Sequence, residues 1–153
     1  MVLTVPAKLI PGGASHHREV ILDPYLISLK EKYPFLSPIY NVYNYPGYSK
    51  LPPHIDSSRN CALNIPILNT ENSDTIFYKL VEPVTHKYVA EKRRNEITSL
   101  LEESFKFSLT TPTLVNNSIP HSMTNNSSDR RIIISWSIDE TIDFITAKTL
   151  FSY

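Results

Sequence analysis

The stretch RRIIISWSI, from Arg130 to Ile138, is the most strand-like part of this chain. Its β-branched isoleucines favour a pleated strand, in which successive side chains leave on opposite faces. The two expected faces are Arg131, Ile133, Ser135 and Ser137 on one side, and Arg130, Ile132, Ile134 and Trp136 on the other. The first face, an arginine followed by small hydroxyl side chains, predicts the wall of a polar pocket. The second face predicts a hydrophobic core.

Four further segments have the residue pattern of strands. Tyr40 to Tyr45 alternates in polarity, and Asn60 to Leu68 is a longer apolar run. Pro66 lies within the longer run and cannot donate a ladder hydrogen bond, which predicts a sheet edge or a bulge at that point. Shorter strands are expected from Thr75 to Leu80 and from Thr113 to Asn116.

Helices are expected in fewer places. Asp23 followed by Pro24 is a favourable helix start, and Pro34 would end that helix. Residues 89–105 carry apolar side chains at helical spacing and predict a second helix. Residues 141–151 fit a helix or an edge strand, and the stretch up to Arg18 fits a loop or an edge strand. The whole pattern predicts a mainly β fold, an antiparallel barrel or a double-sheet jelly roll with one or two covering helices.

Composition limits the classes of function. The 153 residues are expected to form one domain, residues 1–153. Lys and Arg total 15 and so do Asp and Glu, so no bulk positive charge favours nucleic-acid binding. Cys61 is the single cysteine and lies in an apolar run, which predicts a buried small side chain and fits a reducing interior. No apolar run approaches the roughly 18 residues that a membrane span needs, so a soluble cytoplasmic protein is expected.

The residues most indicative of chemistry are His54 and Asp56, with His121 following 65 residues after the aspartate. In an extended backbone, side chains two apart leave on the same face, so His54 and Asp56 could grip one metal ion. Two imidazoles and a carboxylate form the facial ligand set of non-haem Fe(II), which leaves three coordination positions open. An H-x-D pair alone also occurs in ordinary surface turns.

A basic residue follows the second histidine. Arg131 lies ten positions after His121, on the expected pocket face of its strand. Its guanidinium could bind a carboxylate with two parallel hydrogen bonds, and Ser135 could add a third. Arg130 competes for this role, and only the parity of the strand favours Arg131.

Two runs of the sequence resemble one enzyme superfamily. Asn44-Tyr45-Pro46-Gly47 followed by Pro53-His54-Ile55-Asp56 resembles the tyrosine, glycine and H-x-D segment of Fe(II)- and 2-oxoglutarate-dependent oxygenases, with a similar arrangement in prolyl hydroxylases. The run from Val115 to His121, with Arg131 beyond it, resembles the distal half of the aspartyl/asparaginyl β-hydroxylase-like branch. The likeness covers roughly residues 40 to 138, and only the combination of motifs is specific.

The resemblance implies a double-stranded β-helix and a set of site residues. His54, Asp56 and His121 would bind Fe(II), and Arg131 would bind the distal carboxylate of 2-oxoglutarate. Tyr45 or Tyr43 would donate a hydrogen bond to that co-substrate.

The chain departs from the pattern of that superfamily in two places. Many members carry a serine two residues after the arginine, where this chain has Ile133 and places the serine at 135. The β-hydroxylase branch commonly lacks the carboxylate ligand that Asp56 supplies here.

The implied activity is hydroxylation of a C–H bond in an unidentified substrate, with dioxygen consumed and succinate and carbon dioxide released. Two residues are weaker candidates. Asn64 follows the H-x-D motif and is expected to line the cavity, and Arg59 would meet an acidic group of the substrate or remain a solvated loop charge. The alternatives are a cupin-like iron dioxygenase that uses no keto acid, and a catalytically silent jelly-roll binding module. Oligomeric state is not readable from the sequence.

Overall fold

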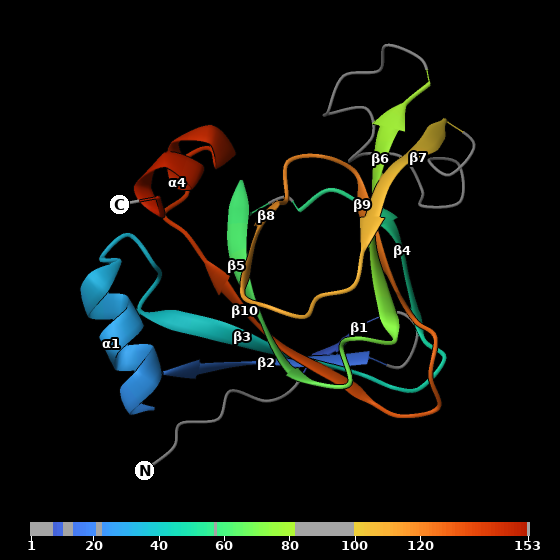
Figure 1. Cartoon of the computed structure of the whole chain (residues 1–153), viewed down its shortest axis with the longest axis horizontal. Helices are drawn as coiled ribbons and strands as arrows, with labels where there is room; N and C mark the ends of the chain where they lie inside the picture. Colours follow the sequence, from blue (N-terminus) through green and yellow to red (C-terminus); the bar gives the residue numbers. More distant parts are fainter. Residues whose placement is uncertain (1–7, 11–13, 21–22, 57, 82–99, 153) are drawn as a thin grey trace.

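The structure is a computed structural model that describes residues 8–10, 14–20, 23–56, 58–81 and 100–152. This part of the chain is mainly β, with two antiparallel sheets and two helices (Figure 1). The strands are β1 (Lys8–Ile10), β2 (Ala14–Val20), β3 (Ile39–Tyr45), β4 (Lys50–His54), β5 (Cys61–Leu68), β6 (Ser73–Leu80), β7 (Leu101–Phe107), β8 (Thr113–Asn116), β9 (His121–Asn125) and β10 (Arg131–Ser137). The helices are α1 (Pro24–Lys32) and α4 (Phe144–Leu150).

The larger sheet has the strand order β1-β2-β3-β10-β5-β8, and the smaller sheet has the order β4-β9-β6-β7. From β3 onward, successive strands alternate between the two sheets, except that β6 and β7 are neighbours in the smaller one. The two sheets face each other in Figure 1, with the smaller sheet on the right. This alternation brings segments that are far apart in sequence to the two inner faces.

Strand β10 lies inside the larger sheet, where it pairs with β3 on one side and β5 on the other. Its faces divide as the alternation predicts. Trp136 is fully buried and packs in the main hydrophobic cluster, whereas Arg131, Ile133 and Ser135 line a cavity between the sheets. The indole Nε1 of Trp136 donates a 2.7 Å hydrogen bond to the carbonyl of Ser37, so the buried ring leaves no unsatisfied donor.

The main hydrophobic cluster covers the outer face of the larger sheet. Its buried members are Leu26, Leu36, Tyr40, Cys61, Leu63, Ile65, Trp136, Ile138 and Ala147. Helices α1 and α4 supply Leu26 and Ala147, and Figure 1 shows both helices on the side of the larger sheet away from the smaller one. Burial also raises the pKa of the Cys61 thiol to about 11, as fits a packing residue. The inner faces are therefore left for a smaller apolar cluster and for the polar cavity.

The expected helix start is confirmed, because the Asp23 side chain accepts hydrogen bonds from the backbone N–H groups of Tyr25 and Leu26. The expected strands are confirmed as well. Pro66 meets both expectations: it lies beyond the last β8 pair, at Asn64, and next to a register shift against β10. The residues 141–151 contain a helix, α4, and the stretch up to Arg18 contains β1 and most of β2.

The helix expected over residues 89–105 is wrong for its C-terminal part. Residues Leu101–Phe107 form β7, which pairs with β6 at the edge of the smaller sheet. Most of its side chains are exposed, so no buried face marked the segment as a strand. The rest of that expected helix, up to residue 99, lies outside the described residues.

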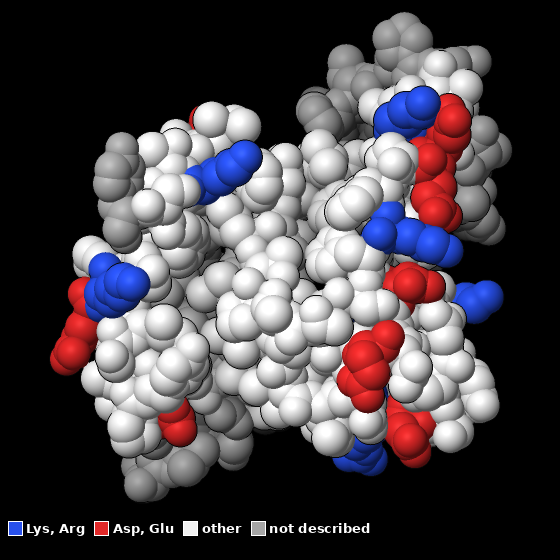
Figure 2. Space-filling model, viewed as in Figure 1, with Lys and Arg blue, Asp and Glu red and all other residues white. Residues whose placement is uncertain are grey.

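Charged side chains are mixed in sign on the face drawn in Figure 2, where acidic and basic groups lie near one another. This distribution agrees with the formal charge of zero. Among the described residues, neither helix has the length and apolar character that crossing a membrane requires.

Candidate metal centre

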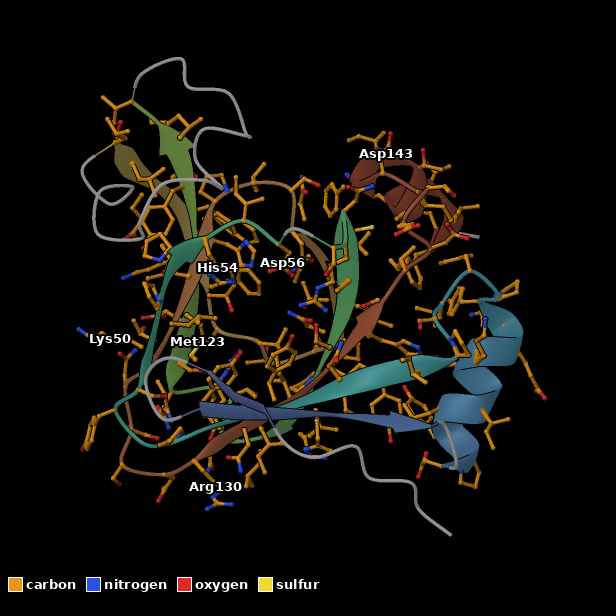
Figure 3. The ribbon with its side chains drawn as sticks, turned by 180° about the vertical axis from the view of Figure 1, so that it is seen from behind. Lys50, His54, Asp56, Met123, Arg130 and Asp143 are labelled. Atoms are coloured by element: carbon orange, nitrogen blue, oxygen red, sulfur yellow. The ribbon has the colours of Figure 1, made fainter. Side chains whose placement is uncertain are left out.

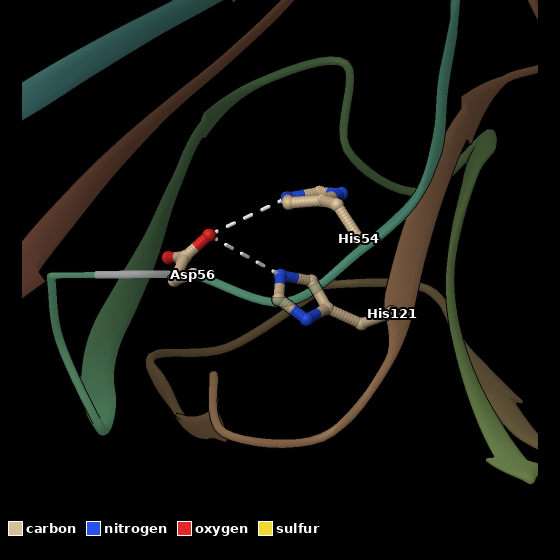
Figure 4. Close-up of side chains that lie close together, drawn as sticks. All are labelled: His54, Asp56 and His121. Carbon is tan, nitrogen blue, oxygen red and sulfur yellow. Dashed lines mark ion pairs between the residues drawn. The ribbon is translucent and has the colours of Figure 1, made fainter. Parts of the chain in front are cut away.

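Three side chains converge between the two sheets. The Nε2 atom of His54 lies 3.4 Å from Oδ1 of Asp56, and the Nε2 atom of His121 lies 3.9 Å from the same oxygen (Figure 4). Their candidate ligand atoms all lie within 4.8 Å of one another, so the group could hold a metal ion. Donors about 2.1 Å from an octahedral metal lie about 3 Å apart along one edge. The two distances to Oδ1 exceed that edge by about 0.4 and 0.9 Å, so the donors would move inward to seat an ion.

Pairing of two strands sets the position of the histidines. His54 ends β4 and His121 begins β9, and they are direct partners in the antiparallel ladder of the smaller sheet. Each histidine follows a proline, Pro53 or Pro120, whose fixed φ restricts the approach of the chain. In the view of Figure 3, His54 and Asp56 point into the space between the sheets, whereas Lys50 points outward.

Both imidazoles are oriented by the same kind of backbone contact. The Nδ1–H of His54 donates to the carbonyl of Pro52, and the Nδ1–H of His121 donates to the carbonyl of Ile119, each over 2.9 Å. A carbonyl can only accept, so Nδ1 carries a proton in both rings. Nε2 of each ring faces Asp56 and is the nitrogen left for metal ligation.

The two oxygens of the Asp56 carboxylate contact different partners. Oδ1 faces the two histidines, while Oδ2 accepts hydrogen bonds from Arg59 Nε at 2.6 Å and from Asn117 Nδ2 at 2.7 Å. Burial by itself would raise the pKa of this carboxyl. The hydrogen bond with His54, the charge and hydrogen bond of Arg59, and the nearby His121 outweigh burial and hold the pKa well below its usual range. Asp56 is therefore an anion near neutral pH.

Burial lowers the pKa of His121, which is 8% exposed, whereas burial by itself raises the pKa of Asp56. Removal from water, together with the neighbouring His54, lowers the pKa of His121 to about 4. The ring is thus neutral at physiological pH and available as a ligand.

A cavity of about 70 Å³ adjoins the three side chains, which is room for roughly five water molecules. Its lining includes the residues that the sequence suggested for a site, apart from the competing Arg130: Tyr43, Tyr45, His54, Asp56, Arg59, Asn64, His121, Arg131 and Ser135. Strands of both sheets contribute to this lining, so the cavity lies between the sheets.

Arg131 is almost completely buried, with 2% of its surface exposed. Within the described part of the chain no carboxylate pairs with it, and its Nε has no hydrogen-bond partner. The guanidinium lies over the ring of Tyr45, 5.3 Å from the ring centre. Burial lowers the pKa of Arg131, yet a guanidinium stays charged. Arg130 is exposed and points away from the cavity in Figure 3, so only Arg131 faces it.

The two tyrosines lie beside the two arginines. Tyr43 and Tyr45 are stacked, with ring centres 6.0 Å apart, and Arg59 lies 6.0 Å from the centre of the Tyr43 ring. Burial raises the pKa of Tyr45, so its hydroxyl remains protonated and able to donate. Asn64 also lines the cavity, and its Oδ1 is buried with no partner among the described residues.

Arg59 is not a solvated loop charge, and that part of the sequence interpretation is wrong. Its side chain is 12% exposed, and besides Asp56 it contacts Ser135 on β10 through a 2.8 Å hydrogen bond from Nη1 to Oγ. Ser135, expected to bind a co-substrate, is thus already an acceptor for Arg59. Asn117 was not chosen as a site residue, although its amide contacts Asp56. Its place in an Asn-Asn run did not distinguish an amide that lines the cavity from one that satisfies a strand end.

No family model matches this chain, and no curated protein matches its sequence. The chemistry of the centre therefore has to be inferred from its own donors and charges. Two imidazoles, one carboxylate and a nearby guanidinium with no carboxylate partner among the described residues form a site that could bind a cation and an anion side by side.

Proposed function

We propose that the protein is an Fe(II)- and 2-oxoglutarate-dependent dioxygenase that hydroxylates a C–H bond of an unidentified substrate. The observation that carries this proposal is the guanidinium of Arg131, which has no carboxylate partner within the described part of the chain and lies in the same cavity as the His54, Asp56 and His121 donors. A buried charge without a partner is costly, so it indicates an anionic ligand that supplies the partner.

The donor set favours a metal that binds small molecules. Two histidines and one carboxylate on one face leave three positions open, which is typical of non-haem Fe(II) oxygenases. The chemistry that Fe(II) would supply is activation of dioxygen, the oxidant: one oxygen atom would go to the keto acid as it is converted to succinate and carbon dioxide, and the other to the substrate C–H bond.

The chain's own residues bind and orient. The guanidinium of Arg131 would take the distal carboxylate of 2-oxoglutarate, with the Tyr45 or Tyr43 hydroxyl as a further donor. Because Arg131 is buried between the sheets, water would be excluded from this charge pair. A cavity of about 70 Å³ admits only a small ligand at this depth, so the substrate would be met at its mouth.

We also infer that strands β3 to β10 form the double-stranded β-helix of that superfamily. The supporting observation is the alternation of strands between the orders β3-β10-β5-β8 and β4-β9-β6-β7, with antiparallel pairing throughout. Eight strands in two facing sheets are typical of a jelly roll.

Binding under anaerobic conditions tests the proposal before a substrate is known. We expect the purified protein to bind one Fe(II), then to bind 2-oxoglutarate with a new visible charge-transfer absorption that succinate does not produce. Admission of oxygen should then release succinate slowly.

Two other results would replace the proposal. Iron binding without any 2-oxoglutarate binding would favour an iron dioxygenase that uses no keto acid. Failure to bind either ligand would favour a catalytically silent binding module.

A further inference from the structure

The second oxygen of the Asp56 carboxylate is held by two protein donors, which the facial ligand set does not by itself require. Arg59 Nε and Asn117 Nδ2 reach Oδ2 over 2.6 and 2.7 Å, while Oδ1 alone faces both histidines. A carboxylate can bind a metal through one oxygen or through both. The two modes leave different numbers of open positions on the metal.

The donors come from different parts of the fold, and both are anchored. Arg59 follows Asp56 by three residues and is fixed at its far end by Ser135, 76 residues away on β10. Asn117 is 2% exposed, follows β8, and donates its backbone N–H to the carbonyl of Asn60 over 2.9 Å. Movement of Oδ2 toward the histidines would break two short hydrogen bonds, one of them from a charged group.

In both contacts the side chain of Arg59 or Asn117 is the donor and Asp56 is the acceptor. The carboxylate can only accept, so the Asn117 amide presents its NH₂ group to Asp56, and its buried Oδ1 is left with no partner among the described residues. The orphaned Oδ1 shows that the amide is oriented for Asp56 at the expense of its own acceptor.

We propose that Arg59 and Asn117 are positioning residues that hold Oδ2 away from the metal, so that Asp56 occupies one coordination position and three remain open. The inference rests on the metal site of the proposed function and does not depend on 2-oxoglutarate. Three open positions are the number that a bidentate keto acid and dioxygen together need, whereas a bidentate Asp56 would leave two. Arg59 and Asn117 thereby determine how many exchangeable ligands the ion can take.

Manganese(II) provides a direct test, because the relaxation of solvent protons by the bound ion scales with the number of water molecules on it. Arg59→Met keeps the length of the side chain and removes every donor. Asn117→Leu removes the other donor without changing charge. Arg130→Met is the matched control, since Arg130 is exposed and lies just before β10. Each protein is loaded with manganese(II) alone, and the enhancement is measured per bound ion.

We expect the unmodified protein and Arg130→Met to give the same enhancement. The two positioning variants should give a value lower by about a third, as three open positions become two. Loss of a residue that orients a ligand typically weakens metal affinity about 10- to 100-fold, so every protein is measured with its manganese(II) site saturated.

Equal enhancement in all proteins that fold and bind the ion would overturn this inference and leave the proposed function intact. A fall in either positioning variant supports it, so the test does not depend on both variants folding. No manganese binding by the unmodified protein would overturn the proposed function and this inference together.

Discussion

His54 and His121 face each other across the ladder between β4 and β9, with their ring centres 4.4 Å apart. The backbone pairing of two strands thus sets the spacing of two metal donors that are 67 residues apart in sequence. Only Asp56 comes from outside this ladder, and Arg59 and Asn117 hold it. We therefore expect all three donors to be needed for tight metal binding.

Replacement of His121 by alanine should abolish tight metal binding. Loss of a residue that merely orients a ligand typically weakens metal affinity about 10- to 100-fold, so loss of the ligand itself should exceed 100-fold. Isothermal titration with Fe(II) under anaerobic conditions measures the change. His17→Ala is the control, since His17 lies on β2 and does not line the cavity. An equal loss in the control would indicate a different site.

Arg131→Met should weaken the binding of 2-oxoglutarate and at the same time stabilise the free protein. With the guanidinium gone, the Kd for 2-oxoglutarate should rise at least about 30-fold, because truncating one partner of a buried charge pair costs about 2 kcal/mol or more. The free protein should become more stable by about 2 kcal/mol, since an unpaired buried charge is replaced by an apolar side chain. Equilibrium dialysis and urea unfolding measure the two effects.

The neighbouring residue supplies the control for this test. Arg130→Met removes an exposed charge just before β10 and should change neither quantity by more than about 0.5 kcal/mol. A less stable Arg131→Met protein would indicate that the guanidinium already has a structural partner, contrary to the proposed ligand role.

The stability of the metal-free protein should depend on pH through His121. Its pKa is lowered from 6.5 to about 4, so the unfolded chain takes up a proton first as the pH falls. The contribution is complete above pH 6.5 and is lost as the pH drops to about 4. It amounts to about 3 kcal/mol at most, because a pKa difference of one corresponds to about 1.4 kcal/mol.

Urea unfolding in the presence of a chelator, repeated between pH 7 and 4, measures this dependence. His121→Phe keeps a ring in the same place and cannot titrate, so its profile should be flatter over that window. Asp56 adds to the loss of stability only at lower pH, since its folded-state pKa lies below its ordinary value of 3.8. Identical profiles for the two proteins would exclude His121 as the cause.

The faces of β10 could be predicted because the strand is buried on both sides. A period of two then separates Trp136 from Arg131 in the sequence as it does in space. The same parity correctly favoured Arg131 over Arg130. Strand β7 could not be predicted in this way, since most of its side chains are exposed and its pairing with β6 depends on a distant partner.

The environment of Arg59 could not be predicted for a related reason. Its spacing of three from Asp56 is visible in the sequence, but its burial depends on Ser135, which reaches it only through the packing of β10. A lone arginine in a polar loop is normally solvated. Asn117 carried still less information, because an amide beside a strand end most often satisfies the backbone.

Gly47→Ala should destabilise the turn that follows β3. A Cβ at this position would lie 2.0 Å from the backbone oxygen of Ser128 and 2.4 Å from its carbonyl carbon, and backbone atoms cannot yield as a flexible side chain does. The adjacent Tyr48 N–H donates to the Ser127 carbonyl over 2.8 Å, so the two segments would have to separate against that bond. Overpacking of this kind costs about 1–3 kcal/mol, or several degrees in Tm for a chain of this length.

Tyr48→Asn is the matched control. Tyr48 is exposed and has a φ of 55°, a left-handed conformation that asparagine adopts more readily. Thermal unfolding of this variant should therefore show equal or higher stability. If Gly47→Ala were as stable as the original protein, the close approach of the two backbones would be refuted.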